Sequence, residues 1–70
     1  MINHLRKYRF LAGELTQQEL AERVQVSRQT IIAIEKGAFN PSVRLALKLS
    51  RVVNVRLEDL FVLEKQDWEA

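Results

Sequence analysis

Residues 16–37, TQQELAERVQVSRQTIIAIEKG, contain the start and stop signals of two short helices, and these signals define the fold. Thr16 and Glu19 stand three residues apart, which is the spacing of a capping box at a helix N-terminus. The sequence therefore predicts a helix over 17–24. Its apolar positions share one side, which we expect to face the core: Leu20, Ala21 and Val24.

A second helix is expected after only three intervening residues. Ser27 is a typical N-cap residue, and Gly37 permits the left-handed backbone that ends many helices, so the pattern predicts a helix over 28–36. Ile31 and Ile34 share its inner side. Because so short a connection forces two helices to cross steeply, residues 16–37 have the outline of a helix-turn-helix.

Turn and capping residues divide the remaining chain into three further helices. Asn3 is the expected N-cap of the first, and Gly13 can end it in a left-handed conformation. Residues 40–42, Asn-Pro-Ser, combine a turn with the cap of the next. We expect these helices over 4–12, 43–53 and 57–62. One Pro and two Gly leave few breaks for an all-β fold, so the predicted class is all-α, with five helices in one domain over residues 1–70.

Length and composition exclude several classes of protein. The chain has 70 residues and no Cys, so disulfides are excluded, and its one His stands outside any cluster of metal-ligating residues. The longest apolar runs are four residues, which supports neither secretion nor a membrane span. No paired nucleophile and base and no Gly-rich phosphate loop indicate an enzyme. We expect a cytoplasmic protein without metal or cofactor.

The charge is divided unevenly along the chain. Residues 1–56 carry ten Lys or Arg and four Glu, a net of +6, whereas residues 57–70 carry one Lys and five acidic residues, a net of −4. A basic body is typical of proteins that bind nucleic acid, because Lys and Arg release the counterions condensed on phosphates. An ordinary solvated surface could carry the same charge, so this observation needs a second one.

The outer side of the helix over 28–36 supplies that second observation. Opposite the two inner Ile residues lie Arg28, Gln29, Ile32, Ala33 and Lys36. Arg can bond a guanine edge, Gln an adenine edge, and Ala or Ile can touch a thymine methyl group. An exposed Ile is unusual on a purely solvated face, and base contacts are expected near the start of a helix in the major groove. The pattern favours a helix that reads DNA.

Five segments, in this order and spacing, resemble the phage Cro/repressor-like helix-turn-helix family, also called the XRE family. They are LTQQELAE (15–22), VSRQTI (26–31), IEKG (34–37), NPS (40–42) and LEDLF (57–61). The resemblance covers about residues 3–63. It implies a lambda-repressor-like DNA-binding domain with the helix-turn-helix over about 16–37. The likeness is greatest to very short stand-alone repressors, whose dimer is built from the last helix and a small sheet formed by both termini.

The resemblance also implies roles for single residues. Base-facing positions are Arg28, Gln29 and Ala33, with Thr30 and Ile32 at the flank. Phosphate-contacting positions are Gln17, Ser27, Lys36, Asn40 and Arg44. Arg9 and Glu35 correspond to an ion pair that joins the first and third helices. Two positions depart from the family pattern: Gln25 replaces the usual Gly of a left-handed turn, and the loop 12–15 is one residue longer than its commonest form.

The chain has more apolar residues than a monomer of this size easily buries. In the helix over 43–53 the only charged residues fall in one stripe, Arg44, Lys48 and Arg51, and apolar residues occupy almost all the other positions. We expect a homodimer with a dimerisation segment over about 55–70, whose interface residues are Leu57, Leu60, Phe61, Val62 and Leu63. Two-fold symmetry would then place two reading helices about 34 Å apart, matching a palindromic operator.

These features together favour a sequence-specific, double-stranded-DNA-binding transcriptional regulator, a repressor that acts as a homodimer without a small-molecule ligand. Two alternatives stay open at this point. An antitoxin-type regulator would also bind a partner protein through the acidic, apolar tail, and a protein-only interaction module would use the same fold without DNA. A steep fall of DNA affinity with added salt separates the last from the others.

Overall fold

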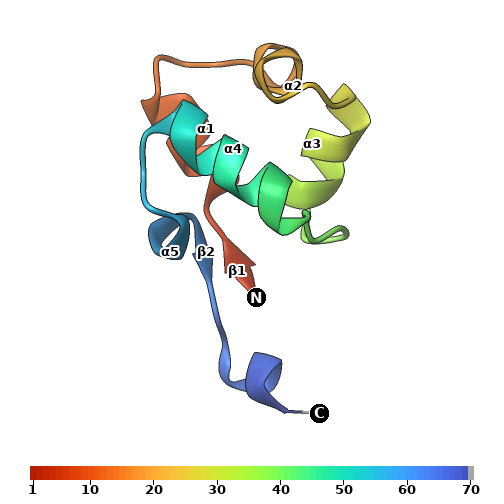
Figure 1. Cartoon of the computed structure of the whole chain (residues 1–70), viewed down its shortest axis with the longest axis vertical. Helices are drawn as coiled ribbons and strands as arrows, with labels where there is room; N and C mark the ends of the chain where they lie inside the picture. Colours follow the sequence, from red (N-terminus) through yellow and green to blue (C-terminus); the bar gives the residue numbers. More distant parts are fainter. Residues whose placement is uncertain (70) are drawn as a thin grey trace.

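The computed structural model describes residues 1–69 and arranges them as a group of short helices with a narrow extension formed by the last described residues (Figure 1). The elements, in chain order, are β1 (Ile2–Asn3), α1 (Leu5–Leu11), α2 (Gln17–Val24), α3 (Arg28–Glu35), α4 (Val43–Val53), α5 (Leu57–Leu60), β2 (Phe61–Val62) and the 3-10 helix η1 (Lys65–Trp68). The described part of the chain thus has the five α-helices that the sequence predicts.

The capping residues place the helix starts as expected. The Thr16 Oγ1 accepts a hydrogen bond from the Glu19 N–H at 3.0 Å, and the Thr16 N–H donates to Glu19 Oε1 at 2.9 Å. The pKa of the Glu19 carboxyl lies below its ordinary value because hydrogen bonds from Thr16 favour the charged form. The bond from the Thr16 backbone has the larger effect, and the bond from its side chain the smaller. Ser27 and Ser42 accept the corresponding bonds at the starts of α3 and α4.

Three helix ends differ from the prediction, and the first of them is that of α1, which ends at Leu11 and not at residue 12. α3 ends at Glu35, one residue early, and the last helix ends at Leu60 instead of continuing to residue 62. Phe61 is extended, with φ −122° and ψ 122°, because β2 pairs antiparallel with β1, Ile2 lying opposite Val62. The small sheet of both termini, which the resemblance implies, is therefore present.

The prediction that Asn3 is the N-cap of the first helix is wrong. Asn3 lies in β1, and the N-cap of α1 is His4, whose side chain makes no capping bond. The Asn3 Nδ2 donates to the Ile34 carbonyl at 2.8 Å, and its Oδ1 accepts from the Leu5 N–H at 3.3 Å. Asn3 thus ties the start of α1 to the end of α3, a tertiary contact that local capping rules do not foresee.

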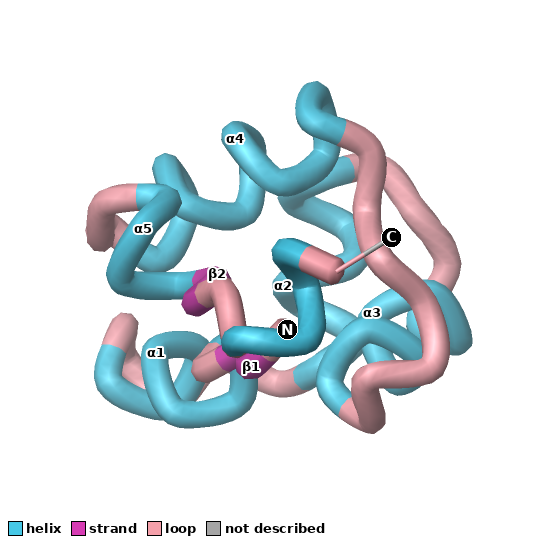
Figure 2. Tube along the Cα trace, turned by 90° about the horizontal axis from the view of Figure 1, so that it is seen from below, coloured by secondary structure: helices cyan, strands magenta, loops and turns pink. Residues whose placement is uncertain are grey.

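The core lies where the five helices meet, and every helix contributes to it. Figure 2 shows the helices arranged around the point where β1 and β2 emerge. The buried residues that pack into one cluster there are Leu5, Leu20, Ala21, Val24, Ile31, Ile34, Leu49, Val53 and Leu60. The inner faces predicted for α2 and α3 are confirmed by this set. None of the helices in residues 1–69 is long and apolar enough to cross a membrane.

Residues 61–69, which we call the C-terminal stalk, project from the helical body at the end opposite α2 (Figure 1). The molecule consequently measures 35 × 21 × 19 Å. The Met1 α-amino group lies 3.0 Å from a carboxylate oxygen of Asp67 and 3.0 Å from one of Glu64. Hydrogen bonds to Asp67 and then Glu64 raise the pKa of this amino group above its ordinary value. The acidic end of the chain is thereby held away from α2.

Gln25 adopts the left-handed conformation expected at its position, with φ 63° and ψ 45°. Because Cβ is strained there and Gly has none, we expect Gln25→Gly to raise the free energy of unfolding by about 1 kcal/mol. Gln25→Ala, which keeps a Cβ, is the matched control and should give no such gain. Urea unfolding followed by circular dichroism measures both. A Gly variant less stable than the Ala variant would contradict the argument.

Candidate nucleic-acid interface

The outer face of α3 begins with two exposed polar side chains. Arg28 and Gln29 occupy its first two positions and are exposed, whereas Ile31 and Ile34 have no exposed surface. Ile32, expected to be exposed, is only half-exposed because it lines a cleft against α1 and α2. The outer face of α3 is therefore more polar than the sequence predicts, and Arg28 and Gln29 in its first turn are exposed.

Ser27 and Thr30 form a small hydroxyl pair at the start of α3. The Ser27 Oγ accepts a hydrogen bond from the Thr30 N–H at 3.3 Å, and the two hydroxyl oxygens lie 3.0 Å apart. Ser27 is exposed and Thr30 half-buried. The capping bond fixes the direction in which α3 leaves the turn, and so orients Arg28 and Gln29 relative to α2.

A hydrogen-bonded network joins α1, α2 and α3 behind this face. Arg9 Nε lies 2.8 Å from Glu35 Oε2, and Arg9 Nη2 donates to Glu35 Oε1 at 3.3 Å. Gln17 Nε2 donates to the same Oε1 at 3.2 Å, and Arg9 Nη1 donates to the Leu15 carbonyl at 2.6 Å. The Arg9 and Glu35 side chains are only 14% and 7% exposed. The ion pair expected from the resemblance is present, and it also holds Gln17.

Two clefts bring the candidate residues together. One, of about 500 Å³, lies at the start of α2 and is lined by Arg9, Thr16, Gln17, Gln18 and Arg28. The other, of about 390 Å³, lies where three helices meet and is lined by Arg6, Arg9, Gln17, Ile32, Glu35 and Lys36. We call the second the three-helix cleft. Gln17 lines both clefts, one of which contains the start of α3 at Arg28 and the other its end at Glu35.

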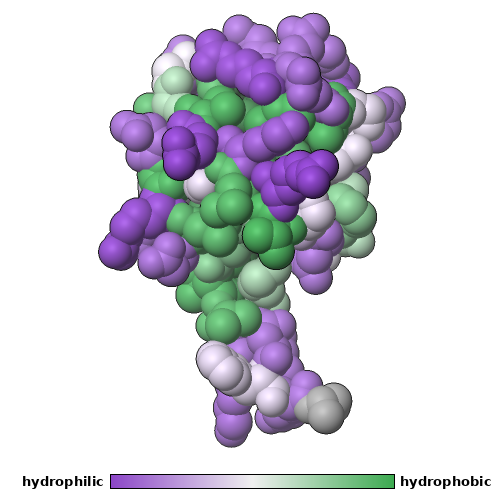
Figure 3. Space-filling view, viewed as in Figure 1, coloured by the Kyte–Doolittle hydropathy of each residue, from purple (hydrophilic) through white to green (hydrophobic). Residues whose placement is uncertain are grey.

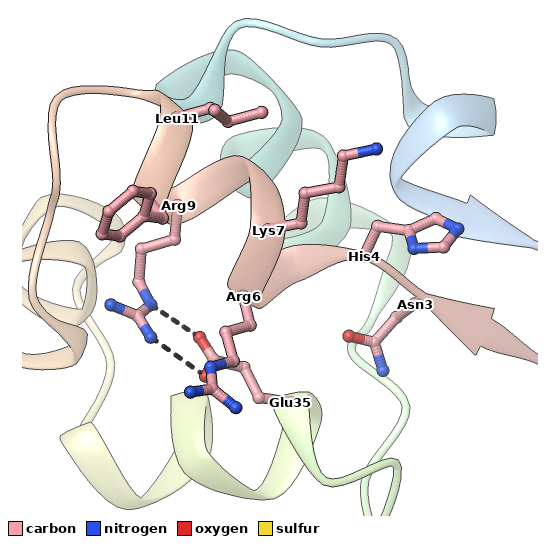
Figure 4. A pocket seen from close by; sticks show the side chains of 8 residues that line it. Asn3, His4, Arg6, Lys7, Arg9, Leu11 and Glu35 are labelled. Atoms are coloured by element: carbon pink, nitrogen blue, oxygen red, sulfur yellow. Dashed lines mark hydrogen bonds and ion pairs between the residues drawn. The ribbon is translucent and has the colours of Figure 1, made fainter.

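A wider pocket of about 780 Å³ extends the three-helix cleft along α1 (Figure 4). Figure 4 shows the Arg9 side chain reaching from α1 to Glu35 on α3, and Arg6 extending from α1 toward the same helix. Arg6 was not among the predicted site residues. A sequence signal was available, because Arg6 precedes Arg9 by one helical turn and so shares its face of α1.

Comparison with known proteins decides what kind of interface this is. A family model described as Helix-turn-helix matches residues 5–60. The chain belongs to the XRE family of helix-turn-helix transcriptional regulators. As an XRE-family protein it is a DNA-binding regulator with a lambda-repressor-like fold, and it is not an enzyme.

Relatives of this XRE-family protein match most of its length. An uncharacterized HTH-type transcriptional regulator of Methanocaldococcus jannaschii is 49% identical over 67 residues, which cover 96% of this chain and 100% of that protein. Another from Archaeoglobus fulgidus is 48% identical over 67 residues, covering 96% of this chain and 94% of the other. The crystal structure of the restriction-modification controller protein C.AhdI from Aeromonas hydrophila is similar, with a TM-score of 0.72, 32% identity, and coverage of 81% of this chain and 85% of that chain.

The other candidate phosphate-contacting residues of the XRE-family protein lie outside both clefts. Asn40 is exposed in the loop between α3 and α4, and Arg44 is exposed in the first turn of α4. Lys48 and Arg51 continue the exposed cationic stripe along α4, as predicted. The loop thus offers an exposed amide, and the start of α4 an exposed cation.

One residue predicted for the dimer interface is assigned wrongly. Leu60 has no exposed surface because it packs into the core of its own chain, so it cannot contact a second copy directly. Leu57 and Phe61 are half-buried, while Val62 and Leu63 are 36% and 56% exposed. The apolar surface near the end of the chain that a partner could contact is therefore formed by the neighbours of Leu60, chiefly Val62 and Leu63.

Proposed function

We propose that this XRE-family regulator is a cytoplasmic repressor that binds a palindromic operator as a homodimer and blocks a promoter by occupying it. The observation that carries this proposal is the exposure of Arg28 and Gln29 at the first turn of α3. Side chains at this turn of a recognition helix are those that reach base edges in the major groove.

The proposed base contacts follow from the chemistry of each side chain. Arg28 offers two parallel donors to guanine, and Gln29 offers a donor and an acceptor to adenine. Ala33, half-exposed farther along α3, is small enough for a thymine methyl group to approach. Thr30 and Ile32 flank these positions and are half-buried, so they shape the edge of the surface.

The proposed phosphate contacts surround this reading face on three elements. Gln17 opens α2, Ser27 precedes α3 and Lys36 follows it. Asn40 and Arg44 supply the border at the start of α4. Contacts to phosphates fix the register of a protein on DNA without reading its sequence, and they make the affinity fall as salt is added.

A second copy of this chain is the proposed occupant of the exposed apolar surface. Val43 and Leu47 on α4 are 74% and 48% exposed, and Val62 and Leu63 continue that apolar character in the stalk. Figure 3 shows apolar surface running from the helical body down onto the stalk. Burying this surface between two copies would stabilise both, in proportion to the apolar area removed from water. The proposed dimerisation segment, about residues 55–70, includes the stalk.

Selection of bound duplexes from a random DNA pool tests the proposed function. We expect enrichment of a palindrome whose half-site centres are one helical turn apart, because two-fold symmetry repeats α3 on the same side of the duplex. A pool that stays random after selection, despite salt-dependent binding, would contradict sequence-specific recognition. Enrichment of single, unpaired half-sites would contradict the homodimer.

Leu63→Glu tests the dimer directly. Placing a charge in an apolar interface is expected to weaken dimerisation by at least about 2 kcal/mol. Leu11→Glu is the matched control, because Leu11 is also largely exposed, at 66%, but lies at the end of α1. Sedimentation equilibrium should show a monomer for Leu63→Glu and a dimer for Leu11→Glu. Equal association constants for the two variants would remove Leu63 from the interface.

A further inference from the structure

The three-helix cleft contains more positive charge than its own residues neutralise. Arg9 is paired with Glu35 at 2.8 Å. The other two cations that line the cleft, Arg6 on α1 and Lys36 after α3, have no ion-pair partner among residues 1–69. Both are exposed. The cleft therefore presents two uncompensated cations from two different elements.

Glu35 does not pair with Arg6 or Lys36, because both of its carboxylate oxygens already accept hydrogen bonds from other residues. Its Oε1 accepts from Arg9 Nη2 and Gln17 Nε2, and its Oε2 accepts from Arg9 Nε. Because the Arg9 guanidinium lies 2.8 Å from the Glu35 carboxylate and neutralises it, Glu35 adds little net negative field at the mouth of the cleft. An anion that approaches there meets Arg6 and Lys36 without strong repulsion from Glu35.

We propose that Arg6 and Lys36 together hold one phosphate of the DNA backbone at the mouth of the three-helix cleft. This inference rests on the proposed function, since the duplex reaches the cleft only when α3 enters the major groove. Lys36 is the C-cap of α3, and half-buried Ile32, one turn earlier on the same helix, lines the cleft with it. Backbone flanking the groove passes beside that end of the helix. Arg6 thereby adds α1 to the surface that positions the protein on DNA.

Lys7 provides a matched control on the same helix. It carries the same charge as Arg6 and is also exposed. It lines the wider pocket along α1 but not the three-helix cleft that Lys36 borders, and its Nζ lies 5.3 Å from the centre of the Tyr8 ring. Removing either charge changes the long-range field of the protein equally. Only the loss of Arg6 should remove a direct phosphate contact.

The test measures the dissociation constant of the full chain for a duplex of fixed random sequence at several salt concentrations, so it needs no knowledge of the operator. Arg6→Gln is expected to weaken binding about tenfold and to lower the slope of log affinity against log salt by about 1. Arg6→Lys should keep the slope, and Lys7→Gln should weaken binding less than about threefold. Thermal melting should be unchanged for Arg6→Gln, because Arg6 makes no side-chain hydrogen bond within residues 1–69.

Each outcome separates this site from the function on which it rests. If DNA binding by the unsubstituted protein weakens with salt and Arg6→Gln leaves the slope of log affinity against log salt unchanged, the site is overturned and the proposed function stays supported. Equal losses for Arg6→Gln and Lys7→Gln would overturn it as well, because only the general field would be acting. If the DNA affinity of the unsubstituted protein did not change with salt concentration, both the proposed function and the site would be overturned.

Discussion

Arg28→Ala is expected to weaken operator binding by about 1–3 kcal/mol more than it weakens binding to random DNA. Arg28 is exposed at the first position of α3 and has no ion-pair partner among the described residues, so its guanidinium is available to a guanine edge. Gln29→Ala should lose a similar amount at an adenine position. Dissociation constants for the selected operator and for a scrambled duplex, at one salt concentration, give this discrimination.

Arg44→Ala is the control for this prediction. Arg44 is also an exposed cation at the start of a helix, but on α4 it is proposed to contact phosphate. Its loss should weaken binding to both duplexes alike, and Gln17→Ala should do the same. If Arg28→Ala also weakened both duplexes equally, Arg28 would be a phosphate contact, and the assignment of base reading to this turn would be wrong.

Glu35→Ala is expected to lower the free energy of unfolding by about 3 kcal/mol, a large share of the stability of a small domain. The substitution removes the acceptor of three hydrogen bonds that join α1, α2 and α3. It leaves the Arg9 guanidinium, 14% exposed, with the Leu15 carbonyl as its remaining partner among the described residues. An unpaired charge that is mostly buried is costly because water replaces the lost partner poorly. Urea unfolding measures the loss.

Asp59→Ala supplies the comparison, since it removes an ion pair that is exposed. Arg56 Nε lies 3.3 Å from Asp59 Oδ2, with side chains 75% and 46% exposed. Exposed pairs contribute at most about 1 kcal/mol, because water competes for both charges. If Glu35→Ala lowered the free energy of unfolding by as little as Asp59→Ala does, the buried hydrogen-bonded network between α1 and α3 would not contribute the stability argued for it.

Local signals were sufficient to predict most helix boundaries. The capping box of Thr16 and Glu19 acts within one helical turn, and so do the caps of Ser27 and Ser42. The left-handed turn at Gln25 also depends on only a few neighbouring residues. Because the atoms that make these interactions are close in the chain, their order in the sequence determines their geometry.

The predictions that failed concern residues whose environment comes from distant parts of the chain. Asn3 looked like a cap, but it bonds to Ile34, 31 positions away. Leu60 looked like an interface residue, but it fills the core between the helices. Ile32 looked exposed, but α1 and α2 partly cover it. Periodicity shows that a side chain is apolar and which neighbours share its face, not which other element will cover that face.

Capping and periodicity, which act over one or two helical turns, were enough to predict the helix-turn-helix and the polar residues at the start of α3, whereas the left-handed turn at Gln25 was expected from the family resemblance. The hydrogen bond between Gln17 and Glu35, 18 positions apart, follows only from the packing of α1, α2 and α3, whereas the Arg9–Glu35 ion pair, across 26 positions, was expected from the family resemblance. Only the docking of α1 against α2 and α3 placed Arg6 and Lys36 around one cleft. Such contacts depend on how whole helices pack, and packing is set by the summed shape of the core and not by any short segment.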